Sequence, residues 1–347
     1  MPDIAEDPEP KPRRSRFLSG IGRPYLFEIV ILIQLLLFEL MQISSGFLLS
    51  SQLVLIAIRE FVPATLLDAA AGVLLHIGWS AFRGRGREYL RTVFSGKWLL
   101  LTARIMFAET LMIYTYGWIK LLLPLTRDRW FDAQLWQADR IVFGGMSPNV
   151  LFLTLFSWPP FLRLVDLSYG YLFFTALTVS TALFLSLRSE RLRVAFATGS
   201  IALWSVSAWL YYLVPSMGPA YRFGDVWFAY EKYLPVTRSL QHALLRSFLG
   251  VLKLREHVID PAVRFTFGIA AFPSLHVGFT TFVALWIGVF SRRMGLLAGL
   301  VAAMIFVGSV ITGWHYFIDS LAGAVLGVLC FAWTYRMYRI GEVETRD

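Results

Sequence analysis

Cysteine is nearly absent from this sequence, which has one such residue, Cys330, among its 347. Cys330 lies inside an apolar run near the C-terminal end. A single cysteine excludes an intramolecular disulfide and any pair of thiolates for metal binding or redox chemistry. It also carries no information about the redox compartment, so other features have to indicate where the chain resides.

Charged side chains are also scarce. They make up 16% of the residues, whereas 57% are hydrophobic, and the mean hydropathy is +0.61. These values argue against a soluble fold and predict an all-α polytopic membrane protein. The formal net charge is +9, but the basic residues form short clusters between apolar runs, where they set membrane topology. A nucleic-acid partner is therefore not expected.

Eight apolar runs, each close to the roughly 20 residues that a span requires, predict eight transmembrane helices. They cover residues 25–43, 61–82, 98–123, 166–187, 194–214, 275–290, 297–312 and 316–334. The polar residues 1–24 predict a disordered cytoplasmic tail. Residues 25–97 predict two accessory helices with a basic loop. The apolar piece 148–165 is broken by Trp158-Pro159-Pro160, which favours an interfacial or re-entrant segment.

Basic residues set the predicted orientation of these spans. More than half of the 32 Lys and Arg residues fall in segments that are cytoplasmic if the N-terminus is inside, as the positive-inside rule expects. Both termini are then cytoplasmic, and the long segment 215–271 lies outside. We expect an integral protein of a bacterial inner membrane or of a plasma membrane. Trp130, Trp227 and Trp314 are expected in an interfacial aromatic belt.

The strongest candidate for chemistry is a pair of segments near the C-terminus that this topology places on the same outer face. His315 and Asp319 are four residues apart at the start of the last span, so they share one helix face. An aspartate bonded to one ring nitrogen would fix the histidine tautomer and leave the other nitrogen nucleophilic. His276 follows Ser274, a predicted N-cap, at a helix start suited to an anion such as phosphate.

Together, Phe272–His276 and His315–Asp319 resemble the Pro-Ser-x-His and His-x-x-x-Asp motifs of the type 2 phosphatidic acid phosphatase (PAP2) superfamily. The sequence is most similar to the inositol phosphotransferase branch, which includes inositol phosphorylceramide synthases. That branch has Phe-Pro-Ser-Leu-His, His-Tyr-x-x-Asp and an upstream Pro-rich motif like Leu213–Pro219. The region 114–145 resembles that branch more weakly; it contains Lys120, Asp132, Asp139 and Arg140.

The resemblance, which covers roughly residues 110–335, implies a catalytic domain over 98–340 with a six-helix core. It implies that His315 attacks phosphorus, that Asp319 holds His315 and that His276 protonates the departing oxygen. A phosphohistidine intermediate would follow without a cofactor or a metal ion. Membrane lipids would be the partners, as phospholipid donor and as lipid or alcohol acceptor.

The sequence departs from the phosphatases of this superfamily at the phosphate-binding cations. Ser309 stands where they usually carry Arg, Leu275 stands where they usually carry Gly, and their Lys-x6-Arg-Pro motif is missing. Phosphoryl transfer still requires positive charge around the equatorial oxygens. The candidate phosphate and head-group ligands are Arg222, Arg264, Lys120, Arg140, Ser274 and Pro219.

Three other functions are compatible with the same residues. The first is a lipid or isoprenyl phosphate phosphatase, with water as the acceptor. The second is an intramembrane zinc hydrolase that uses His276, His315 and Asp319 as ligands. The third is a lipid transporter or scramblase, with intramembrane charges lining a path. Those charges are Arg104, Glu109 and Asp166.

Gly323 and Gly327 in the last span form a small-x-x-x-small pattern, with Ala322 beside it. Small residues at this spacing let two helix backbones approach closely. We expect the pattern to serve helix packing inside the core.

Overall fold

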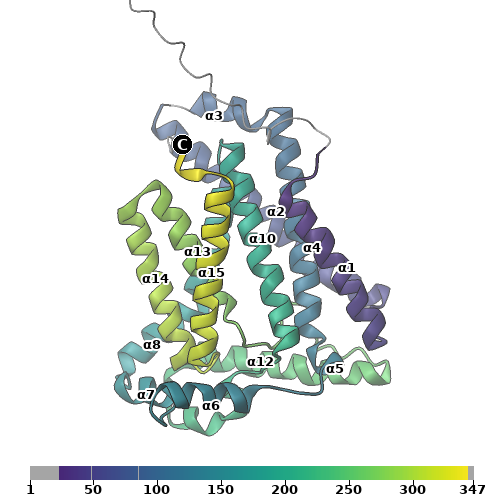
Figure 1. The fold of residues 1–347 in the computed structure, drawn as a ribbon, viewed down its shortest axis with the longest axis vertical. Coiled ribbons are helices and arrows are strands. Elements are labelled where there is room, and N and C mark those ends of the chain that lie inside the picture. The colour runs from purple at the N-terminus through teal and green to yellow at the C-terminus, as the bar shows by residue number, and fades with distance from the viewer. Residues whose placement is uncertain (1–22, 48, 85, 343–347) are drawn as a thin grey trace, which may run out of the picture.

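The computed structural model describes residues 23–47, 49–84 and 86–342, which form a bundle of helices without a β-strand (Figure 1). The predicted all-α polytopic membrane fold is confirmed. Nearly all of the predicted N-terminal tail lies outside the described residues.

Within these described residues, six helical stretches are long and apolar enough to cross a membrane. They are α1 (Leu26–Ser45), α4 (Gly96–Leu121), the continuous stretch 159–185, α10 (Glu190–Leu213), α14 (Arg292–Ile311) and α15 (Phe317–Met337). The other two predicted spans coincide with helices whose apolar part is shorter. These are α2 (Ser51–Phe82), apolar over Ala70–Phe82, and α13 (Leu275–Phe290).

The stretch 159–185 corrects the prediction for residues 148–165. Only the first part is a separate short helix, α7 (Pro148–Leu155), whereas α8 (Pro159–Leu167) already begins the spanning helix. Pro159 and Pro160 occupy its first turn, where proline's missing N–H leaves no helical hydrogen bond unmade. The helix passes through a π-helical turn, η2 (Ser168–Leu172), into α9 (Phe173–Leu185).

Helix α10 forms the centre of the bundle. Its apolar window is 83% buried, against 28–39% for the other five spanning stretches. It packs against α1, α4, α9, α13 and α15. The remaining helices can therefore face lipid on one side while α10 supplies the common core.

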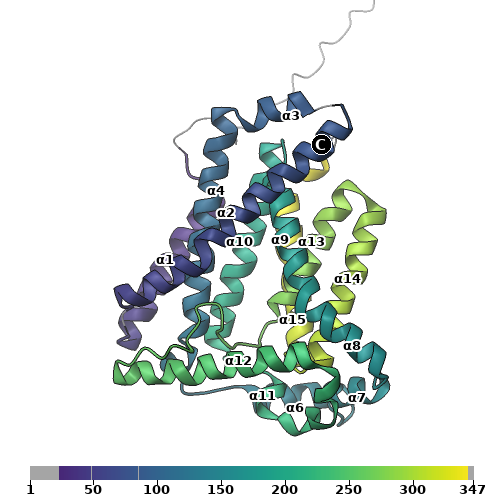
Figure 2. The ribbon, with the colours of Figure 1, turned by 180° about the vertical axis from the view of Figure 1, so that it is seen from behind.

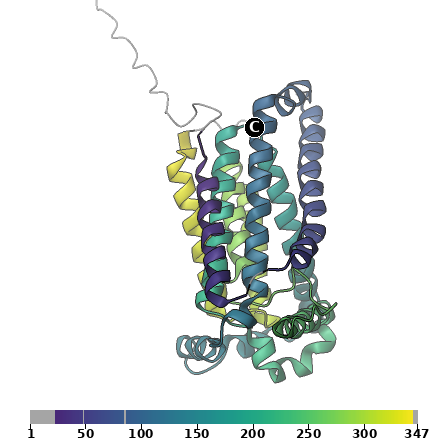
Figure 3. The ribbon, with the colours of Figure 1, turned by 90° about the vertical axis from the view of Figure 1, so that its right-hand side faces the viewer.

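The short helices gather at the two ends of the bundle. At the end that carries the described C-terminus lie α3 (Gly86–Val93) and η5 (Ile340–Glu342), as Figures 1 and 2 show. At the opposite end, α12 (Pro235–Leu252) runs across the spanning helices (Figures 1 and 2). Figure 3 shows the short helices at this end from the side. The same end holds α5 (Leu123–Thr126), α6 (Asp132–Val142), α7, α11 (Pro219–Arg222), η3 (Gly224–Tyr233) and η4 (Lys253–Glu256).

Two glycines of α15 bring α13 and α15 into backbone contact, as the small-residue pattern predicts. A Cβ atom on Gly323 would lie 2.1 Å from the carbonyl oxygen of Ser274, and one on Gly327 would lie 2.3 Å from that of Gly278. No side chain fits at these separations. The start of α13, which carries His276, is therefore held directly against the first turns of α15.

Candidate active site

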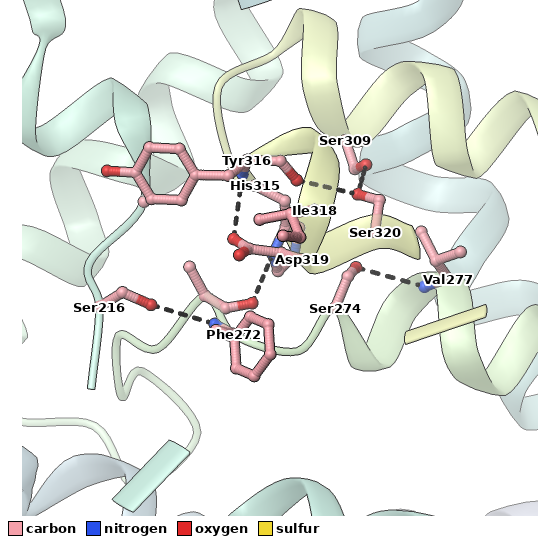
Figure 4. A network of polar contacts seen from close by, with 12 residues as sticks. Ser216, Phe272, Ser274, Val277, Ser309, His315, Tyr316, Ile318, Asp319 and Ser320 are labelled. Atoms are coloured by element: carbon pink, nitrogen blue, oxygen red, sulfur yellow. Dashed lines mark hydrogen bonds and ion pairs between the residues drawn. The ribbon is translucent and has the colours of Figure 1, made fainter. Parts of the chain in front are cut away.

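His315 lies in the short loop between α14 and α15, 3% exposed. Its Nδ1 is 2.8 Å from the carbonyl oxygen of Ala271 (Figure 4). A carbonyl only accepts, so Nδ1–H is the donor and Nε2 keeps its lone pair. Burial, with a smaller contribution from the positive charge of Lys120, lowers the pKa of His315 to about 3, although the bond to Ala271 acts in the opposite direction. The site thus holds a neutral imidazole in one tautomer.

Asp319 is on the same face as His315, but it is not the hydrogen-bond partner that the spacing predicts. Its Oδ2 is 3.7 Å from Nδ1 of His315 and accepts a bond of 3.0 Å from the backbone N–H of Tyr316. The other carboxylate oxygen has no partner among the described residues. The Ala271 carbonyl therefore fixes the tautomer, and the carboxyl group of Asp319 lies beside the ring without a hydrogen bond to it.

His276 faces His315 from the first turn of α13, and the two ring centroids are 5.8 Å apart. Ser274 is the N-cap of this helix, as predicted, because its Oγ accepts from the N–H of Val277 (Figure 4). The His276 ring packs 4.1 Å, between centroids, from Phe173 of α9. Its Nδ1 is buried without a hydrogen-bond partner among the described residues. The structure thus brings together the two histidines that the sequence singled out.

The carbonyl groups at the end of α14 and in the loop that carries His315 accept hydrogen bonds from the short helices at this end of the bundle and from α12. Asn149 of α7 donates to the carbonyls of Val310, at 2.7 Å, and His315, at 3.1 Å. Trp227 Nε1 donates to the carbonyl of Ile311 at 2.7 Å, and Gln241 Nε2 donates to that of Thr312 at 3.0 Å. The backbone N–H of Ala220 donates to the carbonyl of Gly313 at 2.9 Å. Trp227 is fully buried, so its expected place in an aromatic belt is wrong.

Asp139 of α6 caps the N-terminus of α15 from a distant part of the chain. Its carboxylate accepts from the N–H groups of Phe317, at 2.7 Å, and Ile318, at 2.9 Å. These N–H groups have no partner inside the helix. Burial raises the pKa of Asp139, and the two hydrogen bonds oppose that rise. Sequence reasoning placed Asp139 only in a region of weak similarity, because nothing local connects it with α15.

Asp132, the first residue of α6, fixes the Pro-rich motif against the same loop. Its carboxylate accepts from the N–H groups of Met217 and Gly218 and from the hydroxyl of Tyr316, at 2.9 to 3.1 Å. Burial raises its pKa, and these bonds oppose the rise. A side chain at Gly218 would lie 2.4 Å from the carbonyl oxygen of Trp314, and φ is +100° there. Pro219 follows, buried, as the first residue of α11, so its role is to shape the backbone.

The candidate cations occupy different places. Lys120 of α4 is half-buried, its positive charge contributes to the lowered pKa of His315, and its Nζ lies 5.9 Å and 5.6 Å from the ring centroids of Tyr116 and Tyr211. Arg222 and Arg264 are exposed. Arg140 is also exposed, and its Nε donates to the carbonyl of Gly145 at 2.8 Å in the same loop. Lys120 is therefore the candidate that the geometry favours.

Aromatic side chains surround this lysine and His276. Tyr116 of α4 and Tyr211 of α10 have ring centroids 5.9 Å apart. Tyr169, in the π-helical turn, lies 5.1 Å from the ring centroid of His276, and its buried hydroxyl has no partner among the described residues. A π-helical turn inside an α-helix is frequent at functional sites. No pattern in the sequence indicated Tyr169, since the turn exists only in three dimensions.

The intramembrane charges of the transporter alternative have structural contacts. Asp166 accepts from the N–H groups of Val236 and Thr237 at the start of α12, and Arg104 forms an ion pair with Glu28. Among the described residues, no three His, Cys, Asp or Glu side chains converge as ligands of one metal ion would.

Comparison with known proteins gives one family match. The model of the PAP2 superfamily matches residues 133–333, more than half of the chain, and this range contains both histidines, Asp319 and the capping residue Asp139. Comparisons with curated proteins and with solved structures give no match.

Proposed function

Because this chain belongs to the PAP2 superfamily, we propose that it is a membrane phosphotransferase that moves a phosphoryl group or a phospho-headgroup between lipids through a phosphohistidine at His315. The observation that carries the proposal is the pairing of a neutral, tautomer-fixed His315 with His276 at 5.8 Å between ring centroids. A phosphoryl group is small enough to contact both rings at once.

In the first step, Nε2 of His315 attacks phosphorus and forms a P–N bond. The bond between phosphorus and the leaving alkoxide oxygen breaks, and its electron pair stays on that oxygen, which takes a proton from protonated His276. Positive charge beside the negative equatorial oxygens lowers the barrier for such a transfer, and Lys120, whose charge acts on His315, is the proposed source. The charge of Asp319, 3.7 Å away, stabilises the cationic phosphohistidine.

In the second step, the oxygen of an acceptor alcohol attacks the phosphorus of phosphohistidine. The P–N bond breaks, and its electron pair returns to Nε2 of His315. His276, now neutral, removes the proton of the alcohol and is ready for another cycle. Tyr169, whose buried hydroxyl has no partner within the described part of the chain, lies beside His276 and is proposed to donate a hydrogen bond to the alcohol oxygen.

The proposed donors are phospholipids, with phosphoinositol as one possible transferred group on the strength of the branch resemblance. The proposed location of the site is the extracytoplasmic face. Support comes from the sequence, since more than half of the Lys and Arg residues fall in the segments predicted to be cytoplasmic, among them the start of α14, at the end opposite to His315. Basic residues concentrate on cytoplasmic ends.

The direct test uses the purified protein in detergent with a panel of phospholipids and isoprenyl phosphates, with and without inositol, followed by mass spectrometry. A new lipid that depends on an added alcohol is the expected product. Free phosphate without a new lipid would instead assign the phosphatase alternative, in which water takes the place of the alcohol.

Variants test the mechanism within the same assay. His315→Ala should reduce turnover by a factor of about 10³ or more, because the nucleophile is gone. His276→Ala should cost about 10² to 10⁴, most with a lipid alkoxide as leaving group, and Asp319→Asn should leave a small remnant. His242→Ala, on the exposed face of α12, is the matched control. Near-normal turnover in the His315 variant would contradict the mechanism.

A further inference from the structure

A cavity lies between accessory helix α2 and the core helices α4, α9 and α10. Its volume is about 610 Å³, and apolar side chains such as Val73, Ile77, Ile105 and Leu177 form most of its wall. This volume is within the range of about 300–1,000 Å³ that is typical of ligand pockets in proteins. The catalytic residues described above do not line it.

The cavity adjoins the candidate active site along two of its helices. On α4, Met112 lines the cavity, and Tyr116, one turn further on, contacts Lys120. On α9, Leu177 lines the cavity, and Phe173, one turn earlier, packs on His276. Trp204, another wall residue, is 4.8 Å from Tyr116 between ring centroids. The two sites therefore share a wall of aromatic side chains.

The cavity extends away from the histidines toward the opposite end of the bundle. Its lining on α4 runs from Trp98 to Ile113, which at the rise of an α-helix corresponds to about 22 Å. The hydrocarbon core of a bilayer is about 30 Å thick, so this length exceeds the depth of one leaflet. An apolar space that begins beside a phosphoryl-transfer site and continues this far matches an extended hydrocarbon chain.

We propose that this cavity holds one hydrocarbon chain of the lipid substrate while its phosphate lies between His276 and His315. The inference rests on the proposed function and adds where the chain binds and how its length is selected. The accessory helix α2 then takes part in the site, because Ala70, Val73, Leu74 and Ile77 line one side of the cavity.

Glu109 gives the cavity a second chemical property. It is 6% exposed, one carboxyl oxygen has Ser200 as its partner, and Oε1 has none among the described residues. A buried polar group without a partner is costly, and a ligand can supply the missing bond. A chain that carries a hydroxyl or an amide should therefore bind better than a plain chain.

The test for chain length compares a variant that fills the cavity with one that does not. Thr181 lines the cavity, whereas Val179, two residues away on α9, is 39% exposed on the outside of the bundle. Thr181→Trp should lower kcat/KM for a long-chain lipid phosphate by about tenfold or more, while activity on a short-chain analogue persists. Val179→Trp should leave kcat/KM for both substrates unchanged. Leu177→Ala, which enlarges the cavity, should shift the preference toward longer chains.

Short-chain turnover shows that each variant is folded and that the proposed function holds. If wild-type protein releases and transfers no phosphate from any lipid, the proposed function fails. If the wild type is active but Thr181→Trp and Val179→Trp affect long and short chains equally, the chain lies elsewhere and this inference is overturned.

The test for Glu109 compares a lipid with a hydroxylated chain and its plain counterpart of equal length. The wild type should prefer the hydroxylated chain by several-fold, and Glu109→Leu should remove that preference while Glu109→Gln retains part of it. An unchanged preference in Glu109→Leu would show that Glu109 does not contact the chain.

Discussion

At the scale of single residues, His315 owes its orientation to a main-chain carbonyl. The bond from Nδ1 to Ala271 is 2.8 Å long, and the Asp319 carboxylate stands 3.7 Å away. A backbone acceptor has no protonation state that changes in the working range, so it holds the imidazole tautomer independently of pH. The proposed role of Asp319 is to stabilise the ring once phosphorylation makes it cationic.

The lowered pKa of His315 predicts tolerance to acid. With a pKa of about 3, the imidazole stays neutral as the pH falls through the ordinary histidine pKa of about 6.5. In a single turnover, protonation of His315 should therefore cause no fall in the rate of phosphoenzyme formation with a midpoint near pH 6.5. The measurement is a rapid-quench pH series. A midpoint near 6.5 that persists in His276→Gln would mean that His315 itself takes up a proton there.

Lys120 should carry the phosphate-binding charge. Lys120→Met is expected to lower kcat/KM by about 10² to 10³, the usual cost of removing one group that stabilises the transition state, and Lys120→Arg should restore part of it. Arg222→Met and Arg264→Met, at exposed positions, serve as comparisons and should cost little. A larger loss in either arginine variant would transfer the assignment to that side chain.

At the scale of elements, the start of α15 is fixed from both directions. Asp139 caps its N-terminus, and α13 lies against Gly323 and Gly327. These contacts therefore hold Asp319 of α15 and His276 of α13 in one arrangement. A change at either contact should lower turnover although neither contact includes a proposed reacting atom.

Removal of the cap should destabilise this arrangement. Asp139→Ala leaves two N–H groups without acceptors, at a cost of about 1–3 kcal/mol each, whereas Asp139→Asn keeps one oxygen and should cost less. The measurement is thermal unfolding in detergent together with turnover. Asp225→Ala, exposed in η3, is the control. Equal unfolding midpoints for Asp139→Ala and Asp225→Ala would show that the cap contributes nothing.

The close contact of α13 and α15 gives a matched pair of glycine variants. A methyl group at Gly323 would meet Ser274 at 2.1 Å, but one at Gly299 of α14 would meet nothing within 4 Å. Gly323→Ala should therefore separate the histidines and reduce turnover strongly. Gly299→Ala should be neutral or stabilising by about 0.5–1 kcal/mol, since alanine favours a helix. Comparable turnover in both variants would contradict the role of the contact.

At the scale of the whole molecule, the bundle has two chemically different ends. The site end carries α12 and the layer of short helices, and the other end carries the described C-terminus with α3 (Figure 1). The layer at the site end holds the carbonyls of the catalytic loop through Asn149, Trp227 and Gln241, so orientation in the membrane decides where the chemistry occurs.

This orientation can be measured by labelling, because Cys330 is the only cysteine and is buried. In a Cys330→Ala background, Ser239→Cys on α12 should react with a membrane-impermeant maleimide added to intact cells. Arg339→Cys should react only after the membrane is opened. The reverse pattern would place the site on the cytoplasmic side.

Local sequence patterns determined the apolar helices, the N-cap at Ser274, the shared face of His315 and Asp319 and the packing glycines of α15. Each depends on residues within a turn or two of one another, so their spacing is visible in the sequence. Only the tertiary structure decided the partner of His315, the position of Lys120, the caps by Asp139 and Asp166 and the π-helical turn with Tyr169. The bond between His315 and Ala271 joins residues that are 44 positions apart, and the bond between Ile318 and Asp139 joins residues that are 179 positions apart. No periodicity in the chain encodes which distant carboxylate or carbonyl will meet a given helix end.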